Sequence, residues 1–176
     1  FTNAMRSTID TTGLFKMSSF SEPLAFVNIK QSGNVPESVK ARKWNQLAVA
    51  LSDDIDPAKF NAATLKQDLS INANQMMSKR DINIYSQDNH ADEWGYAIKS
   101  VDKSYINKNI PLGFETKVGG VDYEFELSPQ SINLEDYDVF IIDRLLNNVH
   151  NISKEGPYRF NVFKQSKQQD RFFMRF

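Results

Sequence analysis

The chain has 176 residues, a net charge of −1, 40% hydrophobic residues, 24% charged residues and no cysteine. This length and composition are typical of one globular domain with a hydrophobic core, and too short for two ordinary domains. The near-neutral charge argues against a nucleic-acid-binding domain, the lack of cysteine excludes disulfides and thiolate metal sites, and no apolar run approaches the roughly eighteen residues of a membrane-spanning helix, so we expect neither a nucleic-acid partner nor membrane insertion.

The N-terminal part of the chain contains two predicted strands. Residues 24–30 (LAFVNIK) have alternating side chains that favour a strand, and residues 31–36 (QSGNVP) predict a turn. For residues 44–51 (WNQLAVAL), the alternatives are a second strand and, on helix propensity alone, a short helix. We favour a strand there because the apolar run is short and Pro57 follows soon.

The middle of the chain predicts less regular structure. Residues 53–59 predict a loop that opens a helical turn. Residues 60–80 are rich in helix formers but have uneven apolar spacing, which predicts an irregular loop with one short helix. Three strands are predicted after it, at residues 82–85, 96–100 and 110–115.

A β-hairpin is predicted around Gly119 and Gly120. Two adjacent glycines suit the positive φ angles of tight hairpin turns. The predicted strands are residues 111–117 and 121–127, and in the second of them apolar and acidic residues alternate. This pattern is typical of an antiparallel strand with one buried face.

The last forty residues predict three more strands, at residues 137–143, 158–163 and 171–176. In the first, Val139, Ile141 and Asp143 share a face, although we interpret Asp143 and the adjacent Arg144 as surface charges at the strand end. About ten strands with regular turn signals predict an all-β fold, an antiparallel, jelly-roll-like β-sandwich with one short helix. The predicted organisation is a single β-sandwich domain over residues 1–176.

Two acidic segments are candidate cation sites. Asp88, His90 and Asp92 combine carboxylates with an imidazole, a set that can hold a hard cation, and the alternative is a solvated loop between two strands. The segment SDDIDP (residues 52–57) resembles part of a calcium loop, but it lacks the glycine and the closing glutamate of an EF-hand. A Ca²⁺ site is therefore possible, and no other cofactor is expected.

Trp94 and Tyr96 are candidate ligand-binding residues. Flat aromatic rings can stack on the apolar face of a sugar, and the alternative is that both rings belong to the sandwich core. Asn151-Ile152-Ser153 matches a glycosylation sequon on paper. There is no nucleophile elbow, catalytic cysteine or phosphate-binding loop in the sequence, so no catalytic residues are predicted.

Six short segments of the chain form a recognisable pattern. They are FTNAMRS (residues 1–7), IPLGF (110–114), YDVFIID (137–143), NIS (151–153), YRF (158–160) and DRFFMRF (170–176). In this order they resemble the C-terminal region of large secreted and cell-surface proteins of Bacteroidota that are exported by the type IX secretion system. Residues 60–94 resemble that region only loosely.

The resemblance implies a non-enzymatic β-sandwich module, placed before a separate sorting domain in a longer parent chain. It implies an extracellular or cell-surface location, a role in adhesion or gliding motility, and the translocon of the secretion system as a partner. Surface polysaccharide or other cell-surface proteins are further expected partners. The alternative function is a carbohydrate-binding accessory module of a secreted polysaccharide-degrading enzyme, which predicts that Trp94 or Tyr96 is exposed.

Overall fold

The computed structural model describes residues 22–33, 35, 45–52, 66–68, 82–87, 94–96 and 98–176. In this part of the chain every regular element is a strand, apart from one short 3₁₀ turn at Lys103–Tyr105. The strands are β1 (Leu24–Ser32), β2 (Asn45–Ser52), β3 (Lys66–Asp68), β4 (Ile82–Ser86), β5 (Trp94–Tyr96), β6 (Ile98–Asp102), β7 (Ile110–Thr116), β8 (Val121–Leu127), β9 (Phe140–Asp143), β10 (Asn148–Asn151), β11 (Tyr158–Val162) and β12 (Ser166–Arg175).

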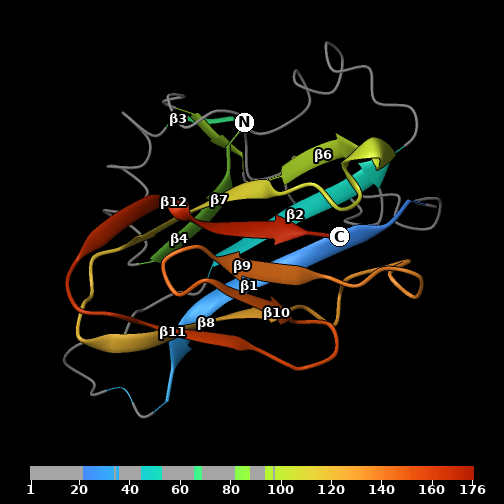
Figure 1. The fold of residues 1–176 in the computed structure, drawn as a ribbon. Helices are drawn as coiled ribbons and strands as arrows, with labels where there is room; N and C mark the ends of the chain where they lie inside the picture. Colours follow the sequence, from blue (N-terminus) through green and yellow to red (C-terminus); the bar gives the residue numbers. More distant parts are fainter. Residues whose placement is uncertain are drawn as a thin grey trace, which may run out of the picture.

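The strands form two sheets. One has five strands in the order β11-β8-β1-β2-β6, and the other has seven in the order β10-β9-β12-β7-β4-β5-β3. Neighbouring strands are antiparallel except β2 and β6, which are parallel. Figure 1 shows β9 and β12 in front of β1 and β8. The apolar core consists of side chains from both sheets. The predicted all-β, antiparallel sandwich is confirmed.

Alternation along the strands explains the core. In β8, Val121, Tyr123 and Phe125 are buried while Asp122 is exposed, as the sequence predicts. Glu124 is the exception, because it is only 7% exposed. β11 alternates in the same way, with buried Tyr158, Phe160 and Val162 facing the other sheet.

The predicted hairpin at Gly119 and Gly120 is wrong. β7 pairs with β4 and β12, whereas β8 pairs with β1 and β11, so the chain crosses from one sheet to the other between β7 and β8. Gly120 has φ +74°, and a Cβ on Gly119 would lie 2.3 Å from the Cα of Lys164. The glycines therefore allow a tight crossing beside the β11–β12 loop, not a hairpin.

An aromatic cluster fills the middle of the sandwich. The rings of Phe160 and Phe172 lie 4.6 Å apart, and Phe125 lies 5.0 Å from each of them. Phe114 joins the cluster with its ring edge toward Phe160, at 5.3 Å. These rings come from both sheets, so the phenylalanine-rich sequence supplies the packing that holds the two sheets together.

Four short strands differ from the sequence prediction. β5 and β6 stand in place of the one strand predicted at residues 96–100, and β10 was not predicted. Residues 66–68, which fall in the segment predicted as a loop with a short helix, form β3. The rest of that segment lies outside the described residues.

Candidate functional site

A buried polar network joins the two sheets near the end of β9. Asp143 is the last residue of β9 and follows Ile141 on the inner face of its sheet. Tyr158 begins β11 in the opposite sheet. Arg171 lies in β12 beside a register irregularity between Gln168 and Phe172. In a regular strand, neighbouring side chains point to opposite faces. Here Arg171 reaches the buried Asp143 and the next residue, Phe172, also faces the core, which the irregularity in β12 allows.

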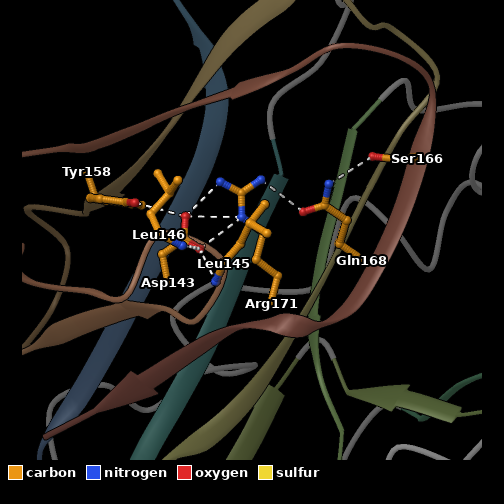
Figure 2. A network of polar contacts seen from close by, with 7 residues as sticks. All are labelled: Asp143, Leu145, Leu146, Tyr158, Ser166, Gln168 and Arg171. Atoms are coloured by element: carbon orange, nitrogen blue, oxygen red, sulfur yellow. Dashed lines mark hydrogen bonds and ion pairs between the residues drawn. The ribbon is translucent and has the colours of Figure 1, made fainter.

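Figure 2 shows how the side chains converge. The Arg171 Nε lies 3.0 and 3.1 Å from the two carboxylate oxygens of Asp143, and its Nη2 donates to Oδ2 at 2.7 Å. The Tyr158 hydroxyl donates to the same Oδ2 at 2.9 Å. On its other side, Arg171 donates from Nη1 to the Gln168 Oε1 at 3.2 Å, and Gln168 donates to Ser166.

Asp143 also fixes the turn that follows it. The backbone N–H groups of Leu145 and Leu146 donate to its Oδ1 at 2.9 and 3.3 Å. The N–H of Arg144 donates to the backbone carbonyl of Arg171 at 2.9 Å. One carboxylate thus holds the two sheets and the β9–β10 turn in register.

Burial and hydrogen bonding have opposite effects on the pKa of Asp143, whose side chain is fully buried. Burial alone would raise its pKa, but the hydrogen bonds from Arg171 and Tyr158, together with the positive charge of Arg171, lower the pKa below its ordinary value. The pKa of Tyr158 is raised to about 12, by burial first and then by the adjacent Asp143 carboxylate. The network therefore contains an ionised carboxylate and a neutral phenol.

This arrangement has little capacity for catalysis. Both Asp143 oxygens already accept hydrogen bonds from Arg171, from Tyr158 and from the turn backbone. The Arg171 guanidinium is also flanked by the rings of Phe160 and Phe172, at 5.2 and 4.5 Å. A carboxylate with a lowered pKa and occupied acceptors is a poor general base or metal ligand. The geometry supports a structural role.

A second carboxylate cluster lies on the outer face of the five-stranded sheet. Glu124 of β8 accepts hydrogen bonds from Ser32 at 2.9 Å and from Arg159 at 3.0 Å, and it lies 3.2 Å from the Nζ of Lys30. Burial tends to raise its pKa, but the hydrogen bonds from Ser32, Arg159 and Lys30 lower it. The cluster ties β1, β8 and β11 together from outside.

A third cluster lies on the seven-stranded sheet. The Tyr85 hydroxyl donates to Glu115 at 3.1 Å, and Lys167 lies 3.5 Å from the same carboxylate. Burial and the Glu115 charge raise the pKa of Tyr85. A Cβ at Gly113 would lie 1.9 Å from the Tyr85 ring, so this ring can pack on the strand only because position 113 is a glycine.

The two predicted ligand-binding residues, Trp94 and Tyr96, both lie in β5. Tyr96 in β5 is 6% exposed, and Lys99 lies 5.6 Å from its ring centroid. Its ring is therefore not an exposed platform for a sugar. Trp94 is the first residue of the same strand, and its side chain lies outside the described residues. The carbohydrate-binding hypothesis now depends on Trp94 alone.

Asp88, His90 and Asp92, as well as the SDDIDP carboxylates, lie outside the described residues. Within the part of the chain that the structure describes, no group of three or more histidine and acidic side chains is placed to hold a metal ion.

The sequon at Asn151 serves a structural purpose in this fold. Asn151 is 7% exposed, and its Oδ1 accepts hydrogen bonds from the Ser153 backbone and hydroxyl and from the Lys154 backbone. Its side chain caps the turn after β10 and is not presented as an acceptor for glycosylation. The neighbouring His150 contacts the Gly156 carbonyl oxygen through its Nε2 at 3.0 Å.

Sequence reasoning missed the Asp143 network. The prediction that Asp143 is a surface charge is wrong, since the residue is fully buried, whereas Arg144 is exposed as expected. The alternation of Val139, Ile141 and Asp143 was a usable signal, because it placed Asp143 on the core face. A buried acid needs a partner, and that partner, Arg171, is 28 residues away.

Comparison of the chain with protein-family models, curated proteins and solved structures gave no match. Across the described ranges, no helix is long and apolar enough to cross a membrane.

Proposed function

We propose that this chain is a non-enzymatic β-sandwich module of a large secreted or cell-surface protein exported by the type IX secretion system, with a role in adhesion or gliding. The secretion machinery is then its partner during export, and surface polysaccharide or other cell-surface proteins are its partners afterwards. The proposal rests on the resemblance of the sequence motifs and on the way those motifs meet in the fold.

The observation that carries the proposal is the convergence of three separate motifs on one network. YDVFIID supplies Asp143, YRF supplies Tyr158 and Phe160, and DRFFMRF supplies Arg171 and Phe172. The Arg171 guanidinium donates hydrogen bonds to Asp143 and stacks on the rings of Phe160 and Phe172. Motifs that specify a fold are expected to place their residues in contact, which is the arrangement here.

The chemistry of the network supports the non-enzymatic part of the proposal. Its polar atoms contact one another and the turn backbone, so its role is to link the sheets and to hold the β9–β10 turn. A module of this kind contributes surface and mechanical stability to a larger protein, with no reacting group of its own.

The first test is the intact mass of the native protein, with a peptide map of the residues before Phe1 and after Phe176. We expect a much longer parent that ends in a sorting domain or in the scar of its removal, and that is found outside the cell. A native protein of only these 176 residues, retained inside the cell, would contradict the proposal.

The carbohydrate-binding alternative has its own test. Soluble glycans are titrated into the chain while tryptophan fluorescence is followed, and the titration is repeated with Trp94→Ala. The proposal predicts no shift that depends on Trp94. A saturable shift that disappears in Trp94→Ala would overturn the assignment in favour of an accessory module for polysaccharide degradation.

A further inference from the structure

The β9–β10 hairpin carries an exposed apolar surface, which borders the buried ring of Phe173 in β12. Leu145 and Leu146 in the turn are 70% and 60% exposed, and Val149 in β10 is 53% exposed. Val149 pairs with Ile142 of β9, which pairs in turn with Phe173 of β12. Cross-strand partners lie on the same sheet face, so these residues form one row on the outer face of the seven-stranded sheet.

Two arginines lie on the same surface, which we call the β9–β12 face and define by Phe140, Ile142, Arg144, Leu145, Leu146, Val149, Phe173 and Arg175. Arg144 of the turn lies over the ring of Phe173, at 4.2 Å from guanidinium to centroid. Arg175 of β12 lies over the ring of Phe140, at 5.4 Å. Within the described ranges, neither arginine has an ion pair. The face thus offers two oriented cations beside apolar side chains.

The strands set the spacing of the two phenylalanines over which the arginines lie. Phe140 pairs with Arg175, and Ile142 pairs with Phe173, so the two stacked rings are diagonal neighbours on β9 and β12. Diagonal neighbours lie about 7–8 Å apart. Alternate residues of an extended chain lie about 6.6 Å apart, so two alternate acidic residues of one extended segment match the spacing of the two residues whose rings lie under the guanidinium groups.

The apolar end of this face is held in a fixed shape before any partner binds. Asp143 accepts hydrogen bonds from the backbone of Leu145 and Leu146, and the Arg144 backbone is bonded to Arg171. The exposed leucines therefore sit on a turn that the buried network orders. A preordered surface loses less conformational entropy on binding.

We propose that the β9–β12 face docks an extended polypeptide segment with two alternate acidic residues followed by apolar residues. The carboxylates lie on Arg175 and Arg144, and the apolar side chains reach the row at Val149 and the turn at Leu145 and Leu146. This inference deepens the proposed function, because it gives the module an interaction surface and a partner chemistry.

Strand addition at the β10 edge is less favoured than docking on the face. Asn151, whose backbone points away from β9, already accepts hydrogen bonds from Lys154 and Glu155 through its carbonyl, and its N–H donates to the Glu155 side chain. Of the edge-facing residues of β10, this leaves only Val149 with backbone groups directed outward. An added strand needs a longer run of such groups.

An anionic membrane fits the geometry less well than a peptide. The leucine pair at the turn and Arg144 could meet a lipid surface together. Arg175, however, lies beside Phe140, at the opposite end of β9 from the turn. A membrane that meets the turn would leave this second cation unused, whereas an extended peptide along β9 contacts both.

The test is a binding titration with the 176-residue chain and a fluorescein-labelled peptide, Glu-Thr-Glu-Thr-Ile-Thr-Ile, followed by anisotropy. The matched control peptide has lysine in place of both glutamates. We expect the acidic peptide to bind more tightly than the lysine peptide and to weaken as salt is added. Arg144→Gln and Arg175→Gln should each weaken it about two- to fivefold, as for exposed ion pairs, and Leu145→Ser with Leu146→Ser should weaken it further.

Two control variants carry the same chemical changes elsewhere on the surface. Arg159→Gln removes an exposed arginine from the other sheet, and Phe163→Ser removes an apolar side chain that is 90% exposed. Both should leave binding unchanged. Circular dichroism and thermal unfolding of every variant show that the fold is retained.

Several outcomes would overturn the docking proposal. These are equal binding of the two peptides, unchanged affinity when both arginines are replaced, and a dissociation constant for the acidic peptide above about 1 mM. Sedimentation with phosphatidylserine vesicles that is lost in Leu145→Ser/Leu146→Ser, without peptide binding, would assign the face to a membrane instead. None of these results bears on the mass and location of the native parent, so the proposed function fails or stands separately.

Discussion

Asp143 and Glu124 are both carboxylates held by an arginine, but they lie in opposite surroundings. Asp143 is fully buried between the sheets, and the side chain of its partner Arg171 is 10% exposed. The side chain of Glu124 is 9% exposed on the outer face, while the side chains of its partners Arg159 and Lys30 are 72% and 41% exposed. The same type of ion pair is thus sealed from water in one place and open to water in the other.

This difference in exposure to water determines how much each arginine contributes to stability. Without Arg171, the buried Asp143 charge would have no cation and no water to replace it. Without Arg159, Glu124 would keep Ser32 and Lys30 as partners, and water can reach the vacated side. We therefore expect the loss in the free energy of unfolding to be several kcal/mol larger for mutations in the Asp143 cluster than for mutations in the Glu124 cluster, although the ion pairs have similar geometry. We call these clusters the two centres.

The largest effect is expected for Arg171→Ala. Removing one partner of a buried ion pair costs about 3–5 kcal/mol, and this variant also removes the cation that stacks on Phe160 and Phe172. The free energy of unfolding is measured by urea denaturation. The double variant Asp143→Leu/Arg171→Met removes both charges and should recover much of the loss. A cost below about 1 kcal/mol for Arg171→Ala would contradict the buried pair.

The contrast between the centres also explains what could be predicted from the sequence. Alternation identified the strands of β8 and β11 and the face of each side chain, because one-sided burial imposes a period of two on the sequence. It also placed Asp143 inward. Its burial was missed because the compensating arginine is remote in sequence, and a single sequence does not reveal which of many cations is the partner.

The sheet assignment of β7 and β8 was beyond sequence reasoning for a related reason. The pair Gly119-Gly120 shows that the chain can turn tightly there, which is local information. Whether the next strand pairs with β7 or crosses to the opposite sheet depends on contacts with distant segments. The approach of Lys164 to Gly119 is one of these contacts, and it is visible only in the folded chain.

A smaller effect is expected for Tyr158→Phe. This variant removes the hydroxyl that donates to Asp143 from the other sheet and leaves the ring in place. A hydrogen bond to a charged group contributes about 1.5–3 kcal/mol, so unfolding by urea should show a loss in this range. Tyr105→Phe is the matched control, since Tyr105 is 41% exposed, and it should change stability by less than about 0.5 kcal/mol. An equal effect of the two variants would argue against the inter-sheet hydrogen bond.

Acid should weaken both the Asp143 and the Glu124 clusters. We expect the larger loss at Asp143, because its protonation leaves the charge of the buried Arg171 without a counter-ion, whereas Arg159 is exposed to water. Both pKa values are lowered in the fold, from the ordinary 3.8 and 4.5. Their contributions are therefore complete above these ordinary values and are lost as the pH falls through the lowered ones. Urea unfolding from pH 6 to pH 2 measures this loss. Asp143→Asn should flatten the acid limb of the profile more than Glu124→Gln, and the reverse order would contradict the comparison.

The smallest effect is expected for Arg159→Ala. An exposed ion pair contributes about 0.2–1 kcal/mol, and Lys30 and Ser32 remain on Glu124 in this variant. Removing Lys30 as well should cost more than the sum of the two single variants, because each cation compensates for the loss of the other. Equilibrium unfolding of both single variants and the double variant tests this coupling. If Arg159→Ala alone were as costly as Arg171→Ala, exposure to water would not be the property that distinguishes the two centres.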